Sequence, residues 1–170
     1  NSILKKDFKI QDGLADVGKV QLLDFAAGTG TFLLEALIQM FEEPEIANSK
    51  PLQKALVNDH FMKNFYGFEY LIAPYTIAHL KLSQFLKDKG YKISKPFQIY
   101  LTNTLEMKIP QGSFPFMQKL KEESVAAYRV KEMPILVITG NPPYNVKSKN
   151  SGEIDDLVKK AYAPQNEKKM

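Results

Sequence analysis

The chain has 170 residues, of which 44% are hydrophobic and 25% charged, and it carries a net charge of +4 and no cysteine. This composition is typical of one globular domain, and it excludes a disordered or fibrous chain, disulfide bonds, thiolate catalysis and cysteine-based metal sites. No stretch reaches the roughly 18 apolar residues of a membrane helix and the start lacks a signal peptide, so we expect a cytoplasmic protein with no membrane partner.

Short apolar runs alternate with longer amphipathic runs along the chain. The short runs predict strands at residues 20–25, 65–68, 97–101 and 135–139. The longer runs predict helices at residues 31–41, 52–61, 75–86 and 117–131. Prolines and polar residues predict loops at 42–51 and 109–116, and the tail from Ser151 is helical at most. This alternation indicates an α/β fold with a mainly parallel sheet.

The ends of the predicted strands are expected to share one edge of the sheet, because right-handed crossovers join successive parallel strands. These ends follow Phe25, Phe68, Leu101 and Thr139. Ligands of open parallel sheets bind at the carboxyl ends of the strands. Residues in these four places are therefore the first candidates for a functional site.

A turn rich in small residues, Asp24-Phe25-Ala26-Ala27-Gly28-Thr29-Gly30-Thr31-Phe32, connects the first strand to the next helix. Glycine takes positive φ without steric cost, and small residues let the backbone approach a ligand closely. A purely structural glycine turn is the competing interpretation. A dinucleotide fingerprint fits less well, because its third glycine would fall at Leu33 and no acidic residue stands about 20 positions further on.

An acidic residue, Glu69, ends the second strand within Gly67-Phe68-Glu69-Tyr70. A carboxylate offers two oxygens, so at this position it can accept two hydrogen bonds from a ribose diol. The alternative is a solvent-exposed glutamate at the end of a strand.

The fourth strand is followed by Asn141-Pro142-Pro143-Tyr144. The two proline rings fix their own φ angles and remove two N–H donors, and each also pushes the residue before it toward an extended conformation. The result is a stiff loop that displays carbonyl oxygens and an amide side chain beside an aromatic ring. Such a loop is a poor metal or phosphate site, but it suits a neutral amine on a flat ring that stacks on Tyr144. A plain proline turn is the alternative.

Together, the glycine turn and the Asn-Pro-Pro-Tyr loop resemble the adenine-N6 DNA methyltransferases, with the motif order of the gamma type. Phe25 stands where that family usually has proline. Thr102-Asn103-Thr104-Leu105 resembles the family's Gly-Asp-Thr-Leu motif, with Asn103 in place of aspartate. The segment 73–82 is similar to a helix of large single-polypeptide restriction enzymes. The resemblance covers residues 1 to about 150.

This resemblance implies a Rossmann-like S-adenosylmethionine-dependent methyltransferase fold, a partial parallel sheet with helices on both faces. Asp24 would hold the methionine end of the cofactor, Glu69 its ribose, and Asn103 its adenine. The implied cofactor-binding residues are Asp24, Phe25, Ala26, Ala27, Gly28, Thr29, Gly30, Thr31, Phe32, Glu69, Tyr70, Asn103 and Thr104.

The implied catalytic residues are Asn141, Pro142, Pro143 and Tyr144. Asn141 and the Pro142 carbonyl would accept the hydrogens of the target amine, and rigid acceptors of this kind act best when they are positioned before reaction. Tyr144 would stack on a base rotated out of the duplex, since N6 cannot be reached inside the stack.

The same resemblance implies that residues 1–170 are the cofactor-binding and catalytic-loop part of a methyltransferase domain, cut before its remaining strands. Double-stranded DNA would bind through the full-length protein, with nuclease, helicase and target-recognition parts in the same polypeptide. The net charge leaves a DNA-facing patch and scattered solvated lysines equally open. His60 and His79 are the only histidines, so we expect no metal site.

Two other functions remain open from the sequence. A protein-glutamine or RNA N-methyltransferase would share the Asn-Pro-Pro-Tyr loop, because a side-chain amide and an exocyclic amine present similar N–H groups. A non-catalytic module that only binds the cofactor is the second alternative.

Overall fold

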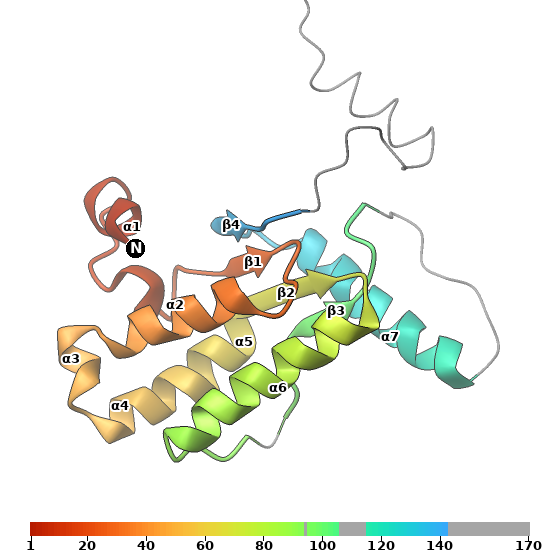
Figure 1. Ribbon diagram of the computed structural model, residues 1–170. Helices are drawn as coiled ribbons and strands as arrows, with labels where there is room; N and C mark the ends of the chain where they lie inside the picture. The colour runs from red at the N-terminus through yellow and green to blue at the C-terminus, as the bar shows by residue number, and fades with distance from the viewer. Residues whose placement is uncertain (94, 106–114, 143–170) are drawn as a thin grey trace, which may run out of the picture.

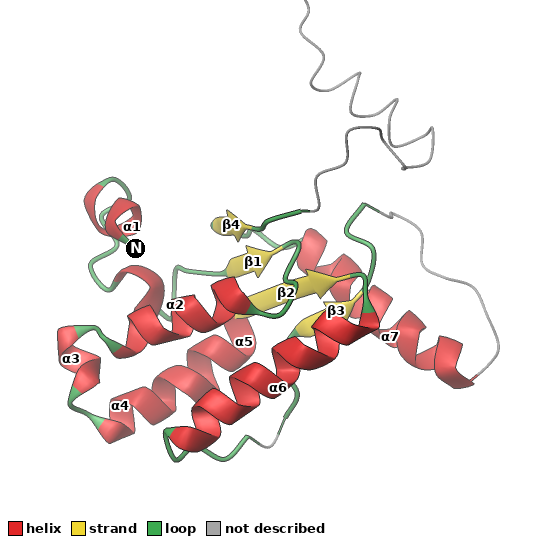
Figure 2. Cartoon of the chain, in the orientation of Figure 1, coloured by secondary structure: helices red, strands yellow, loops and turns green. Residues whose placement is uncertain are grey.

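The protein, described here from a computed structural model, is an α/β fold in which a parallel sheet lies between helices (Figures 1 and 2). The structure describes residues 1–93, 95–105 and 115–142. The elements, in chain order, are α1 (Ser2–Lys6), η1 (Gly13–Ala15), β1 (Leu22–Asp24), α2 (Thr31–Phe41), α3 (Pro44–Ala47), α4 (Lys50–Ala55), η2 (Leu56–Phe61), α5 (Met62–Asn64), β2 (Phe65–Glu69), α6 (Ile72–Asp88), β3 (Ile99–Leu101), α7 (Pro115–Lys131) and β4 (Val137–Thr139).

The four described strands form one sheet in the order β3-β2-β1-β4. All three pairings are parallel, and Asp24 of β1 is in register with Gly67 of β2 and Thr139 of β4. Glu69 at the end of β2 is in register with Leu101 at the end of β3. The predicted strands are therefore confirmed, with ends that shift by one or two residues, and their carboxyl ends share one edge as expected.

The two faces of the sheet bury two separate apolar clusters, because successive strand residues point to opposite faces. Leu22, Phe65 and Ile99 pack against α2 and α6, whose core residues recur at helical spacing. Leu23, Tyr66 and Phe68 pack on the opposite face against Ala127 and Val130 of α7. Helices on both faces of the sheet were predicted, and this arrangement confirms them (Figure 1).

The predicted loop at residues 42–51 is wrong. Residues 44–47 form the short helix α3, and α4 begins at Lys50. Both prolines of this segment lie in the first turn of a helix, where a missing N–H costs nothing and the fixed φ favours helix initiation. The two prolines that predict a loop in this segment, Pro44 and Pro51, instead lie at the starts of helices.

Helices α6 and α7 also begin earlier than predicted, at Ile72 rather than residue 75 and at Pro115 rather than residue 117. Pro74 lies in the first turn of α6, where proline is tolerated. Most of the predicted loop at 109–116 and the whole tail from Ser151 lie outside the described residues.

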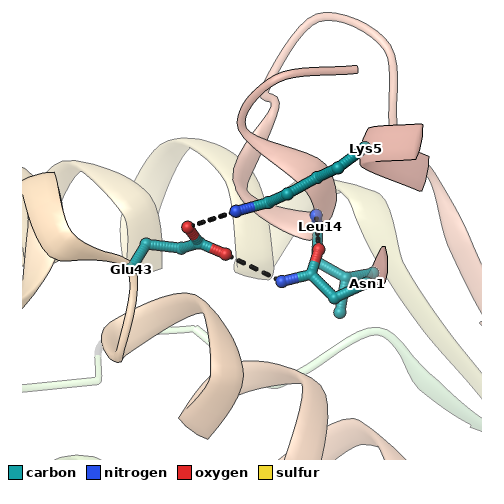
Figure 3. Close-up of polar contacts among 4 residues, drawn as sticks. All are labelled: Asn1, Lys5, Leu14 and Glu43. Atoms are coloured by element: carbon teal, nitrogen blue, oxygen red, sulfur yellow. Dashed lines mark hydrogen bonds and ion pairs between the residues drawn. The ribbon is translucent and has the colours of Figure 1, made fainter. Parts of the chain in front are cut away.

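The first seventeen residues are held against the body of the fold by polar contacts. Glu43 accepts hydrogen bonds from Lys5 Nζ at 2.6 Å and Asn1 Nδ2 at 2.7 Å, and Asn1 Oδ1 accepts from the Leu14 N–H at 2.9 Å (Figure 3). The fully buried His60, in the π-helical stretch η2, lies with Nε2 2.8 Å from the Leu14 carbonyl oxygen. Burial lowers the pKa of His60, so its ring is neutral at physiological pH and serves as a structural hydrogen-bonding group.

Candidate functional site

The ends of the four strands are tied to one another by main-chain hydrogen bonds. The Phe25 N–H donates to the Thr139 carbonyl at 3.0 Å, which joins the ends of β1 and β4. The Ala27 N–H donates to the Phe68 carbonyl and the Thr102 N–H to the Glu69 carbonyl, each at 2.8 Å. The glycine turn and Asn141 therefore lie on neighbouring strands at one edge, as the sequence predicted.

The two glycines of the turn face different surroundings. Both have left-handed backbones, with φ of +54° at Gly28 and +74° at Gly30. A Cβ added at Gly30 would lie 3.0 Å from the Cβ of Ala78 on α6, so this glycine permits close packing between the turn and α6. Among the described residues, a Cβ added at Gly28 would meet only the Ala26 carbonyl oxygen, at 4.0 Å. Open space beside the backbone is thus found at Gly28.

The carboxyl group of Asp24 is fully buried at the end of β1. Its Oδ1 accepts a hydrogen bond from the Ala26 N–H at 3.2 Å, whereas Oδ2 has no partner in the described part of the chain. Burial raises the pKa of Asp24 from 3.8 to about 6; the Ala26 hydrogen bond opposes this rise and the nearby charge of Glu69 adds to it. A buried, half-satisfied carboxyl is costly unless a partner arrives, which favours a cationic or hydrogen-bond-donating ligand.

Glu69 is bonded to three backbone N–H groups. Its Oε2 accepts from Gly28 at 2.8 Å, and its Oε1 accepts from Tyr70 and Leu71, also at 2.8 Å. The side chain therefore joins the glycine turn to the end of β2 and to the start of α6. The interpretation of Glu69 as a solvent-exposed strand-end residue is wrong, since the residue is only partly exposed and both carboxylate oxygens accept backbone hydrogen bonds.

The loop after β3 is attached to the same turn. The Thr104 hydroxyl donates to the Phe25 carbonyl oxygen at 2.6 Å, and Asn103 Oδ1 accepts from the Leu105 N–H at 3.1 Å. Lys131, the last residue of α7, donates to the Thr104 carbonyl at 2.8 Å. Its ammonium also lies 5.7 Å from the centre of the Phe68 ring.

Sequence reasoning missed two residues that support this edge. In the sequence, Lys131 is only the last residue of the helix predicted at 117–131. Glu123, on the same helix, accepts hydrogen bonds from the Leu101 N–H at 2.7 Å and the Tyr75 hydroxyl at 3.0 Å, so it binds the outer edge of β3. No local pattern distinguishes either residue from the other charged residues of α7.

The candidate catalytic residues are described only in part. Asn141 is exposed and Pro142 half-buried, two and three residues beyond the end of β4. Pro143 and Tyr144 lie outside the described residues. The remaining candidates, Tyr70 and Phe32, are exposed beside the edge, and the Thr31 hydroxyl accepts a hydrogen bond from Lys81.

Among the residues that the structure describes, no group of three or more histidine, cysteine, aspartate and glutamate side chains is arranged to hold a metal ion. Each of their helices is too short or too polar to cross a bilayer.

The sequence matches the family described as N-6 DNA Methylase over residues 9–170. A comparison with curated proteins finds no significant match.

Among solved structures, the chain is similar to three DNA-bound proteins. A nuclease-deletion mutant of the Type ISP restriction-modification enzyme LlaGI, in complex with a DNA substrate mimic, aligns with a TM-score of 0.69 and 26% identity over 93% of this chain and 13% of that one. The ATP-dependent Type ISP restriction-modification enzyme LlaBIII bound to DNA gives 0.66 and 29% over 88% and 10%. The DrdV–DNA complex gives 0.68 and 28% over 97% and 16%. The chain thus spans between 10% and 16% of these proteins.

Proposed function

The chain belongs to the N-6 DNA methylase family, and from this premise we propose that it binds S-adenosylmethionine and methylates adenine N6 in double-stranded DNA. Residues 1–170 are then the cofactor-binding and catalytic-loop part of a longer methyltransferase domain. The observation that carries the proposal is the parallel pairing of Asp24 with Thr139, which puts the glycine turn and Asn141 side by side.

The described residues fit the cofactor at four points. The unpartnered Oδ2 of Asp24 offers a buried acceptor to the methionine ammonium, and Gly28 leaves space beside the backbone. Gly30 is the N-cap residue of α2 and provides no side-chain cap, and the positive end of a helix favours the methionine carboxylate. Glu69 Oε2 accepts one hydrogen bond, so a lone pair remains for a ribose hydroxyl.

The bound cofactor supplies an electrophilic methyl group, and the chain supplies the acceptors that activate the amine. The side-chain oxygen of Asn141 and the Pro142 carbonyl accept the two N6 hydrogens. These bonds favour a tetrahedral nitrogen with a free lone pair over the planar, delocalised one. Proline at positions 142 and 143 holds the acceptors rigid before reaction.

The wider assembly is proposed from similarity. LlaGI and LlaBIII are Type ISP restriction-modification enzymes with DNA bound, and this chain spans only a small part of each. We therefore propose a cytoplasmic restriction-modification polypeptide in which nuclease, helicase and target-recognition parts accompany this segment. Target recognition and a flipped base stacked on Tyr144 belong to the full-length protein.

Gly28→Val is expected to reduce the affinity for S-adenosylmethionine, or for its demethylated product, by about tenfold or more, which corresponds to roughly 1.4 kcal/mol. The branched side chain would occupy the space beside the backbone at Gly28. Isothermal titration calorimetry of the 170-residue chain measures this affinity.

Gly90→Val is the matched control. Gly90 also has a left-handed backbone, with φ of +86°, and in the described part of the chain no heavy atom is found within 4 Å of an added Cβ. It follows α6, far from the strand ends, so the control carries similar backbone strain without altering the site. Equal affinities for the two folded variants would place the cofactor elsewhere. Methyl transfer to a glutamine-containing protein or to RNA instead of DNA would favour the alternative substrates.

A further inference from the structure

The aromatic residue Phe25 lies where three strand ends meet. Its N–H donates to Thr139 of β4 at 3.0 Å, and its carbonyl oxygen accepts from the Thr104 hydroxyl at 2.6 Å. Its half-buried ring lies against Gly140, so that a Cβ added at Gly140 would be 2.8, 2.9 and 3.0 Å from three ring carbons. Phe25, a residue of the glycine turn, thus contacts the segment that leads directly into Asn141.

The contact explains the glycine at position 140. Gly140 is not among the glycines of positive φ, so its backbone conformation is open to any residue. The ring of Phe25 occupies the place of a side chain there. Gly140 and Phe25 are therefore complementary in shape. Their contact fixes how far the chain just before Asn141 lies from the glycine turn.

We propose that Phe25 is a positioning residue and does not itself contact the cofactor. Its ring and its N–H set the distance between the glycine turn and Asn141. This inference rests on the proposed methyl transfer. The adenine-N6 DNA methyltransferases that this chain resembles usually have proline at this position. Proline would lack the N–H that Phe25 donates to the Thr139 carbonyl oxygen. In this chain, both the backbone and the side chain of the residue hold the end of β4.

The end of β4 has few other anchors in the described part of the chain. There β4 pairs only with β1, and Ile138 is 65% exposed. Loss of the Phe25 ring would therefore let Gly140 and Asn141 shift. A misplacement of about 1 Å between reacting groups costs on the order of 100-fold in rate.

Steady-state methylation by a full-length enzyme that carries this chain tests the proposal. Phe25→Ala is expected to lower kcat about tenfold or more, with the KM for S-adenosylmethionine changed by less than about threefold, because positioning acts on the chemical step. Phe25→Tyr keeps the ring and is expected to retain most of the activity.

Phe85→Ala is the matched control for loss of a half-buried phenyl ring. Phe85 lies toward the end of α6, with its ring centre 6.1 Å from that of Phe41, and it belongs to no part of the site. The two alanine variants are expected to lose similar thermal stability, but only Phe25→Ala is expected to lower kcat. An equal kcat for both would overturn the positioning role.

A double-mutant cycle on unfolding gives a readout that does not require catalysis. Gly140→Ala alone is expected to lower the melting temperature by several degrees, because its methyl group meets the Phe25 ring. In the Phe25→Ala background the same change is expected to be almost neutral, a coupling typical of residues in contact. Additive effects would refute the contact and the inference with it. Intact coupling in an enzyme that transfers no methyl group to adenine would instead refute the proposed function.

Discussion

Replacing Asn141 by alanine is expected to lower the rate of adenine methylation about 100-fold while leaving the affinity for the cofactor almost unchanged, since one preorganised hydrogen bond is typically worth about 3 kcal/mol of barrier. The Asn141 side chain is exposed beyond β4, whereas Asp24 and Glu69 accept hydrogen bonds from Ala26 and Gly28 of the glycine turn. Loss of the Asn141 side chain therefore removes a hydrogen-bond acceptor for the adenine amine but leaves the contacts of the glycine turn intact.

The measurement is transfer of labelled methyl groups to duplex DNA by a full-length enzyme that carries this chain, with cofactor affinity determined in parallel. Tyr144→Phe is expected to be mild and Tyr144→Ala severe, because stacking on a flipped base requires the ring and not the hydroxyl. If Asn141→Ala methylates adenine at nearly the parental rate, the Asn-Pro-Pro-Tyr loop is a structural turn and has no catalytic role.

The location of the site could be predicted from the sequence because it depends on a simple rule. Parallel strands end at one edge of a sheet, so residues that follow buried apolar runs come together there. This rule predicted that Asp24, Glu69 and Asn141 follow or end strands at one edge of the sheet, and the strand register confirms that shared edge. Element boundaries were less predictable at Pro44 and Pro51, since a proline that starts a helix and one that ends it look alike in the sequence.

The partners of the site residues could not be predicted. Gly28 and Glu69 are 41 positions apart, and Phe25 and Thr104 are 79 apart. Such contacts depend on how the loops close over the sheet edge, which no local pattern records. For the same reason, Glu69 was expected to face a ligand with both oxygens, whereas three backbone N–H groups engage them.

Asp24 offers the test of how charge controls cofactor binding. The affinity for S-adenosylmethionine is expected to fall as the pH is lowered through about 6, because burial raises the pKa of Asp24 to that value. A cationic ammonium prefers the ionised carboxyl, so below this pH binding must first release a proton. The loss approaches about tenfold per pH unit. Calorimetry between pH 5 and 8 in buffers of different ionisation enthalpy measures the affinity and the proton release together.

The ionised carboxyl of Asp24 favours cofactor binding, but it destabilises the folded chain when no cofactor is bound. A folded-state pKa raised above the ordinary 3.8 means that the folded form binds the proton more tightly than the unfolded form. Its contribution to stability is therefore fully present below about pH 4 and is lost as the pH rises through about 6, by at most about 3 kcal/mol. Asp24→Asn should remove this loss and melt at a higher temperature than the parent chain at pH 7, while binding cofactor more weakly and with little pH dependence. If the melting temperatures of both chains change in the same way between pH 4 and 8, the buried carboxyl does not destabilise the fold. If Asp24→Asn keeps its affinity for the cofactor, Asp24 does not bind it.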